Sequence, residues 1–392
     1  MDVKQADLHF IHTYNRTITF TKGEGMYLYD DAGKKYLDMG AGIAVSSLGY
    51  SNEEYKQAIK DQVDKLIHVS NLYYTEPAVK ASKYLAEASG MDKVFFTNSG
   101  AEAIEGALKL ARKYAWLKNP SSKGEIIAMN HSFHGRTMGS LSVTGNKHYR
   151  EAFEPLIGGV SFADYNDLES VKKLITPDTC AVIIESLQGE GGIYPATKEF
   201  FQGVRALCDE NDILLILDEI QCGMGRTGKM FAFQHYDVKP DILTSAKALG
   251  CGVPVGAFAA KAEVAEAMVP GDHGTTYGGN PLATAAVCKV FEIYEKNHIL
   301  EHVQELAPYM TERLQKLAEK YDCIKEVRGM GFMQGMELTI PAGDVVSKSI
   351  EKGLILISAG TNIVRFVPPL VAEKEHIDEM CRILEEVFAS LS

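Results

Sequence analysis

Residues 213–221 have the sequence ILLILDEIQ, in which five consecutive apolar residues are followed by two acids. A strand buried on both faces has this continuous apolar pattern, which is typical of parallel sheets. Ligands of open α/β sheets bind beyond the carboxyl ends of the strands. We therefore expect Asp218, the first residue after the apolar run, to hold a charge in a ligand cleft. The alternative is a strand that simply ends in solvent.

Shorter apolar runs and amphipathic helical patterns alternate on both sides of this segment. They predict helices over 53–67, 76–89 and 101–118, and strands over 94–96, 126–129, 181–184, 242–245 and 255–260. This alternation is typical of an α/β domain with a mainly parallel sheet. Residues 26–39 predict a hairpin. The tail combines helical stretches (281–320, 374–391) with apolar stretches (329–338, 354–357), which indicates a second, smaller α+β domain.

Length and composition restrict the class of protein. At roughly 150 residues per domain, 392 residues suggest two domains. The net charge of −12 argues against nucleic-acid binding, which needs a basic surface. The seven cysteines include no CxxC pair, which indicates reduced thiols and no zinc site. Residues 1–16 lack the apolar core of a secretory signal, and no apolar run is long enough to cross a bilayer. We expect a cytoplasmic protein without a membrane partner.

Two loops that follow apolar runs carry candidate chemistry. Residues 97–101 (TNSGA) lead into a predicted helix, whose free N–H groups and positive dipole end suit a phosphate. The alternative is that Ser99 is an ordinary helix cap. Lys247 follows the strand predicted over 242–245. A desolvated lysine has a lowered pKa and becomes an amine nucleophile, as a Schiff base requires. The alternative is a lysine that extends to solvent.

Other loops offer charged and hydroxyl groups. In residues 131–137 (HSFHGRT), the HxxH pair lacks a third ligand, so we expect no metal; Phe133 could stack on a planar ligand and Arg136 could bind a carboxylate. Arg365 interrupts an apolar strand and needs an anionic partner. The glycine-rich loop 188–192 presents Glu190, and the loop 273–281 presents two adjacent threonines.

Residues 223–228, GMGRTG, match the dinucleotide-binding pattern G-x-G-x-x-G. That pattern binds a dinucleotide in the turn directly between a strand and a helix. Here residues 218–222 separate the glycines from the strand, and residues 229–233 do not resemble a glycine-packed helix. A dinucleotide-dependent oxidoreductase is therefore only a remote alternative.

Together, and in this order, the motifs resemble the class-III aminotransferases of fold type I, which depend on pyridoxal 5'-phosphate (PLP), and most closely their acetylornithine branch. The resemblance extends from residues 14–16 to 365–369 and includes 23–30, 42–45, 133–137, 225–229 and 273–281. It implies a large domain with a mainly parallel sheet over 51–290. A smaller α+β domain would consist of 291–392, joined by the N-terminal segment 1–50. The boundary near 290 falls inside a predicted helix.

The resemblance also implies roles around the cofactor. Lys247 would form the Schiff base with PLP and then move a proton between the substrate carbon and the cofactor. Asp218 would pair with the pyridine nitrogen and keep it protonated, which makes the ring an electron sink. The remaining PLP-binding residues would be Ser99, Gly100, Ala101, Phe133, Glu219, Ile220, Gln221 and Thr276. Thr276 would come from the neighbouring subunit, so the active site would require a homodimer.

The substrate residues follow from the same resemblance. Arg136, helped by Thr275 of the partner loop, would bind the carboxylate remote from the reacting amine. Arg365 would bind the α-carboxylate of glutamate or 2-oxoglutarate. Glu190 would pair with Arg365 when the donor carries a terminal amine. The implied reaction transfers the terminal amino group of N-alpha-acetylornithine to 2-oxoglutarate and gives N-acetylglutamate semialdehyde and glutamate, a step of arginine biosynthesis.

The sequence leaves the amino donor partly open. Ile43 stands where ornithine aminotransferases carry a tyrosine, which favours an acylated or truncated donor. Three departures from the family pattern leave fine substrate preference undecided: Ser186, Ala248 and Tyr50-Ser51-Asn52. Succinylornithine, N-acetyl-lysine-type amines, 4-aminobutyrate and ornithine are alternative donors. A PLP-binding protein without turnover is a further alternative, which the intact set of charged residues disfavours.

Overall fold

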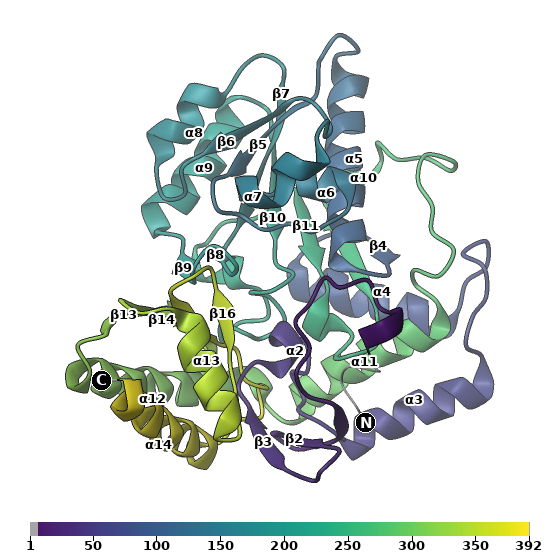
Figure 1. Cartoon of the computed structure of the whole chain (residues 1–392). Coiled ribbons are helices and arrows are strands. Elements are labelled where there is room, and N and C mark those ends of the chain that lie inside the picture. The colour runs from purple at the N-terminus through teal and green to yellow at the C-terminus, as the bar shows by residue number, and fades with distance from the viewer. Residues whose placement is uncertain (1–6, 392) are drawn as a thin grey trace.

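The computed structural model describes residues 7–391, so the first six residues of the predicted N-terminal segment lie outside the described residues. A seven-stranded sheet forms the centre of the chain (Figure 1). In spatial order its strands are β4 (Lys93–Thr97), β12 (Gly256–Ala260), β11 (Ile242–Ser245), β10 (Leu214–Asp218), β7 (Thr179–Glu185), β5 (Glu125–Met129) and β6 (Val160–Ala163). Only β12 pairs antiparallel to its neighbours, so the prediction of a mainly parallel sheet is confirmed.

Both faces of this sheet are covered, which explains its continuous apolar runs. Alternate residues of β10 pack into two separate hydrophobic clusters: Leu214 and Ile216 into one, Leu215 and Leu217 into the other. The first cluster includes α5 (Gly100–Lys118), whose Gly106 lets the ring of Phe258 approach closely. The second includes α9 (Lys198–Glu210). The predicted helices match α3 (Glu53–Lys65), α4 (Glu76–Ser89), α5 and α14 (Lys374–Leu391).

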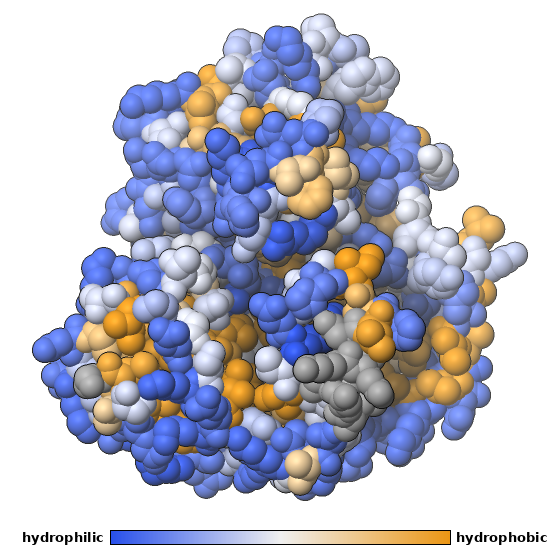
Figure 2. All heavy atoms as spheres, in the orientation of Figure 1, coloured by the Kyte–Doolittle hydropathy of each residue, from blue (hydrophilic) through white to orange (hydrophobic). Residues whose placement is uncertain are grey.

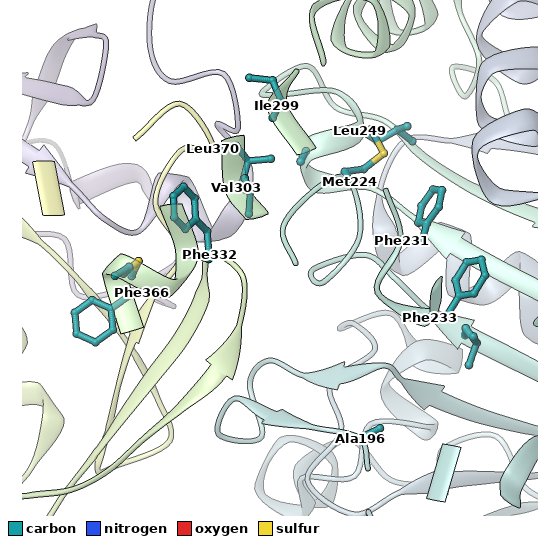
Figure 3. Close-up of a cluster of buried hydrophobic side chains, with 14 of the residues drawn as sticks. Ala196, Met224, Phe231, Phe233, Leu249, Ile299, Val303, Phe332, Phe366 and Leu370 are labelled. Atoms are coloured by element: carbon teal, nitrogen blue, oxygen red, sulfur yellow. The ribbon is translucent and has the colours of Figure 1, made fainter. Parts of the chain in front are cut away.

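A second, four-stranded antiparallel sheet lies in the C-terminal part. Its order is β13 (Ile324–Met330), β14 (Met333–Leu338), β17 (Ile363–Phe366) and β16 (Ile357–Ala359), with α12 (Ile299–Lys320), α13 (Ala342–Glu351) and α14 beside it (Figure 1). The hydrophobic core runs without a break from the large sheet into this part, through residues such as Met224, Phe332 and Leu370 (Figure 3).

The N-terminal strands join the C-terminal part of the chain. Strands β1 (Phe20–Glu24), β2 (Tyr27–Asp30) and β3 (Lys35–Asp38) form a sheet with β15 (Leu354–Ile355). Helix α11 (Pro281–Lys296) crosses the predicted boundary at 290, so the three-part domain division stays a proposal. The helical stretch predicted over 281–320 is confirmed and consists of two helices, α11 and α12, because the chain breaks at His298, whose φ is +50°.

Short elements complete the described chain. The helices are α2 (Ala41–Ala44), α6 (Met138–Ser142), α7 (Lys147–Arg150), α8 (Leu168–Leu174) and α10 (Ala262–Ala265), with the strands β8 (Leu187–Gln188) and β9 (Tyr194–Pro195). The 3-10 turns are η1 (Asp7–His9), η2 (Glu151–Phe153), η3 (Ala232–His235) and η4 (Lys247–Leu249). Within residues 7–391, no helix combines the length and apolarity that crossing a bilayer requires.

Candidate active site

A cavity of about 390 Å³ lies at the carboxyl ends of the strands of the large sheet. Five of its lining residues end a strand or follow one in the chain: Ser99 after β4, Phe133 after β5, Glu185 at the end of β7, Asp218 at the end of β10, and Lys247 after β11. This is the edge at which open α/β sheets bind ligands. The sheet therefore brings together segments that are far apart in the sequence.

Lys247 begins the turn η4 directly after β11. Its φ of +49° lies in the left-handed region, a strained conformation for a residue other than glycine, and such strain is common at functional sites. Burial lowers the pKa of Lys247 to about 8; the charge of Glu190 opposes this shift and that of Arg365 adds to it. A larger fraction of the amine is therefore neutral near pH 7 than for an ordinary lysine, as a nucleophile requires.

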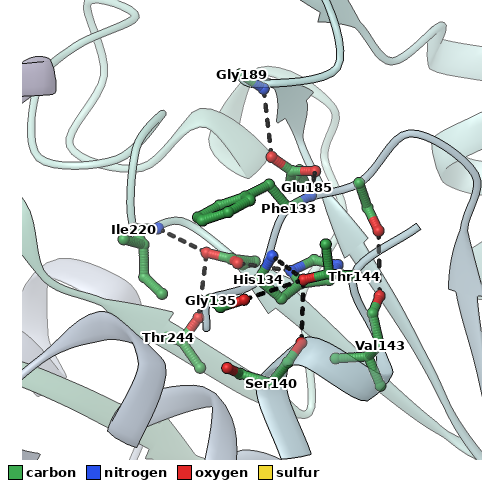
Figure 4. A network of polar contacts seen from close by, with 12 residues as sticks. Phe133, His134, Gly135, Ser140, Val143, Thr144, Glu185, Gly189, Ile220 and Thr244 are labelled. Atoms are coloured by element: carbon green, nitrogen blue, oxygen red, sulfur yellow. Dashed lines mark hydrogen bonds and ion pairs between the residues drawn. The ribbon is translucent and has the colours of Figure 1, made fainter. Parts of the chain in front are cut away.

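Asp218 is held in one orientation by its neighbours. One carboxylate oxygen, Oδ2, lies 2.7 Å from Nδ1 of His134, and the other accepts hydrogen bonds from the Ile220 N–H (2.9 Å) and the Thr244 hydroxyl (3.4 Å), as Figure 4 shows. Burial lowers the pKa of His134, but its hydrogen bond to Asp218 and the charges of Asp218 and Glu185 outweigh that effect and raise it. A histidine paired in this way holds the carboxylate in one orientation.

The sequence marks His134 only as half of an HxxH pair, and its bond to Asp218 depends on the fold. Glu185 is not among the residues that the sequence singles out. It accepts hydrogen bonds from the N–H groups of Phe133 (3.3 Å) and Gly189 (3.2 Å), and burial raises its pKa to about 7. No local signal in the sequence joins these residues, because the strands β5, β7 and β10 bring them together only in the folded sheet.

The start of α5 forms an anion cradle. The Ser99 hydroxyl accepts a hydrogen bond from the Glu102 N–H (3.2 Å), so the capping interpretation holds, yet Ser99, Gly100 and Ala101 also line the cavity. The first N–H groups of a helix have no acceptor within the helix and attract phosphate. A Cβ atom on Gly100 would lie 2.9 Å from Cδ1 of Ile220, so glycine keeps this approach open.

Arg136 and Phe133 lie on another side of the cavity. The guanidinium of Arg136 lies 3.8 Å from the ring centre of Tyr149 and 5.4 Å from that of Phe133. The two rings meet edge to face at 6.1 Å. Tyr149, on α7, was not predicted, since nothing near it in the sequence marks it as part of a site. Its ring orients an exposed arginine that lines the cavity.

Arg365 lies on β17 and is 2% exposed. Its Nη1 donates to Oε1 of Glu190 at 2.6 Å and to Oε1 of Gln221 at 2.7 Å. The charge of Arg365 holds the pKa of Glu190 below its usual range against the opposing effect of burial. The expected need of Arg365 for an anionic partner is met by Glu190, a residue on a glycine-rich loop.

Five candidate residues do not line this cavity: Arg365 and Glu190, which adjoin it through Gln221, and Glu219, Thr275 and Thr276. Glu219 points the other way: its carboxylate accepts hydrogen bonds from the Ser186 hydroxyl and from the N–H groups of Ala232 and Phe233, so it braces the chain after β10. Thr276 is exposed, and Thr275 accepts a hydrogen bond from the Asn98 amide at 3.3 Å. Residues 223–228 form turns and do not begin a helix, so they lack the strand–turn–helix arrangement of the dinucleotide-binding pattern.

The sequence matches a known protein family over nearly its whole length. The family model "Aminotransferase class-III" matches residues 11–388. The chain belongs to the class-III aminotransferases. Among its relatives, the acetylornithine aminotransferase of Clostridium acetobutylicum is 51% identical over 380 residues, which cover 96% of this chain and 98% of that protein. The acetylornithine aminotransferase of Methanocaldococcus jannaschii is 49% identical, with coverages of 98% and 96%.

Solved structures of class-III aminotransferases have the same fold. The N-acetylornithine aminotransferase of Stenotrophomonas maltophilia is 36% identical with a TM-score of 0.85, covering 97% of this chain and 98% of its own. The ornithine aminotransferase of Toxoplasma gondii is 31% identical with a TM-score of 0.95, covering 100% and 95%. The expected fold type I is thus confirmed. Because the higher TM-score belongs to the ornithine enzyme, the backbone fold does not identify the donor.

Class-III aminotransferases depend on PLP, and the cavity of this aminotransferase fits that cofactor. A phosphate fits the anion cradle of α5, a protonated ring nitrogen fits Asp218, and an aldehyde fits the amine of Lys247. Phe133 lines the same cavity and offers a surface on which a flat ring can stack. The start of α5, Asp218 and Lys247 all line the same cavity.

Proposed function

We propose that this class-III aminotransferase transfers the terminal amino group of N-alpha-acetylornithine to 2-oxoglutarate with PLP as cofactor. The ion pair between Arg365 and Glu190 carries the proposal. With Glu190 bound to it, Arg365 offers no charge to an α-carboxylate beside the reacting carbon, which disfavours ordinary α-amino acids as donors. A terminal amine has no carboxylate at that position, and Arg136 remains available for the carboxylate at the far end of the donor.

The charged residues of the site would each have a separate role in the reaction. PLP, when bound, supplies an electron sink for the carbanion formed next to the transferred nitrogen. Asp218, held by His134, would keep the ring nitrogen protonated. Lys247, neutral in part near pH 7, would accept and return the proton at the reacting carbon. In the second half-reaction Glu190 would swing away, so that Arg365 binds the α-carboxylate of 2-oxoglutarate.

We also propose a cytoplasmic homodimer that shares its active sites. Loops 66–74 and 273–280 touch, through hydrogen bonds from the Asn71 amide to the carbonyls of Thr275 and Gly278. Their exposed large apolar residues are Leu66, Ile67, Leu72, Tyr73, Tyr74 and Tyr277. Figure 2 shows orange apolar atoms exposed at the right edge of the molecule, the side on which the loop after α3 lies in Figure 1. An apolar surface of this kind next to the exposed Thr276 supports a partner subunit seated there, whose Thr276 reaches the phosphate.

The dimer is tested by sedimentation of Leu72→Asp with Tyr74→Asp. We expect monomers that bind PLP more weakly than the native chain. A matched pair of acidic substitutions at Val269 and Trp116, exposed apolar residues outside both loops, should leave the dimer intact. Dimers that persist in the loop variant would contradict the proposed interface.

The donor is tested by absorbance. Adding N-alpha-acetylornithine without a keto acid to the PLP-loaded protein should convert its yellow band into the pyridoxamine form, and 2-oxoglutarate should restore it. Succinylornithine, 4-aminobutyrate and ornithine serve as competing donors. A band that moves with one of these and not with acetylornithine would overturn the donor and keep the family. A protein that takes up no PLP would overturn the proposed chemistry.

A further inference from the structure

Arg226 is a buried cation to which the proposed mechanism assigns no role. It belongs to the GMGRTG stretch, is 1% exposed, and is among the largest fully buried side chains. Within the part of the chain that the structure describes, no carboxylate lies within 4 Å of it. Burial lowers its pKa to about 10, so it stays charged at neutral pH. A buried cation without an anion is costly, and such a group persists where its hydrogen bonds are needed.

The hydrogen bonds of Arg226 join two separate parts of the protein. Its Nη1 donates to the carbonyl of Pro368 and, at 3.3 Å, to the carbonyl of Phe332. Its own carbonyl accepts from the Phe332 N–H at 2.9 Å. Gly331 packs so closely that a Cβ atom there would lie 2.5 Å from Cα of Thr227. The loop that follows Asp218 is therefore fastened to the β13–β14 turn and to the segment after β17.

Both fastened segments determine where Arg365 lies. Pro368 follows Arg365 by three residues, and Phe332 directly precedes β14, whose Gly335 pairs with Arg365. On the other side, the loop of Arg226 also carries Asp218 and Gln221. The guanidinium thus sets the distance between the strand of Arg365 and the strand end that carries Asp218. Its Nη1 reaches two carbonyls from different segments, and it lies one bond further from Cα than the ammonium nitrogen of a lysine, so a lysine here does not place its donor at the same point.

We propose that Arg226 is a positioning residue for Arg365 and so controls the half-reaction in which Arg365 binds an α-carboxylate. This inference rests on the proposed function, since it assigns the α-carboxylate of 2-oxoglutarate to Arg365. The half-reaction with acetylornithine places no carboxylate on Arg365 and depends much less on its position. A displacement of about 1 Å at a binding group is enough to weaken a reaction strongly.

The test compares Arg226→Lys and Arg226→Met with the native PLP-loaded protein. We expect the KM for 2-oxoglutarate and the Kd for glutarate, an unreactive dicarboxylate, to rise about tenfold or more. The rate of the acetylornithine half-reaction, followed by absorbance, should change less than about threefold. Arg205→Lys is the matched control: Arg205 is a largely buried arginine that pairs with Asp241 away from the cavity, and its replacement should alter neither half-reaction selectively.

Equal losses in both half-reactions, together with a lower Tm, would overturn the inference and make Arg226 a purely structural residue. If Arg226→Met does not fold, Arg226→Lys decides, since it keeps the charge and has a shorter reach toward the two carbonyls. A failure of the proposed function would give a different result from a failure of this inference, because the native protein itself would then not react with acetylornithine. The Arg226 comparison would still proceed through glutarate binding and through whichever amine the native protein accepts.

Discussion

Nη1 of Arg365, on strand β17, lies 2.6 Å from Oε1 of Glu190, on the glycine-rich loop after β8. Arg365 is almost fully buried, whereas Glu190 is partly exposed on its loop. Moving Glu190 would therefore disturb less packing than moving Arg365. This difference supports the proposal that Glu190 leaves the pair in one of the two half-reactions.

Replacing Glu190 with Ala should shift the donor preference toward ordinary α-amino acids. Without the competing carboxylate, Arg365 is open, so we expect the KM for glutamate as donor to fall about tenfold. The half-reaction with acetylornithine should keep its rate within a few-fold. Glu337→Ala, which removes a carboxylate paired with Arg328 on the neighbouring strands, is the control. Unchanged discrimination between glutamate and acetylornithine in Glu190→Ala would contradict the switch.

Much of this arrangement could be predicted from the sequence, because single residues marked it. Asp218 follows a fully apolar run, Lys247 follows a short buried strand, and Arg365 interrupts an apolar strand. Tyr149 and the partner of His134 could not be predicted, since they depend on which strands become neighbours in space. Glu219 illustrates the opposite error: it lies next to Asp218 in the sequence, but successive residues at a strand end point in opposite directions, so it faces away from the cavity.

His134 should increase the affinity of the protein for PLP. Its replacement with Phe removes the hydrogen bond that orients Asp218, so we expect the affinity for PLP and kcat each to fall about tenfold, as is common for residues that support a binding group. Titration of the PLP-free protein by absorbance measures the affinity. His131→Phe, an exposed histidine three residues earlier, should leave it unchanged. Equal affinities for PLP in the two variants would show that His134 does not contribute to PLP binding.

Tyr149 should affect donor binding through Arg136. Tyr149→Leu loses the aromatic face beneath the guanidinium, a contact that contributes about 0.5–2 kcal/mol. We expect the KM for acetylornithine to rise about twofold to tenfold with little change in kcat. Tyr149→Phe keeps the ring and should restore native values. A rise of the same size in the Phe variant would point to the hydroxyl rather than the ring.

The pKa of Lys247 predicts how the PLP-free protein captures its cofactor. Only the neutral amine attacks the aldehyde, and burial lowers the pKa of this lysine from 10.5 to about 8. The neutral fraction, and with it the capture rate, should rise about tenfold between pH 7 and pH 9 and then level off. An ordinary lysine would continue to gain rate beyond pH 10. Stopped-flow absorbance measures the rate, with free lysine as reference to correct for the ionisation of PLP itself. A rate that still climbs at pH 10 would show that burial does not activate Lys247.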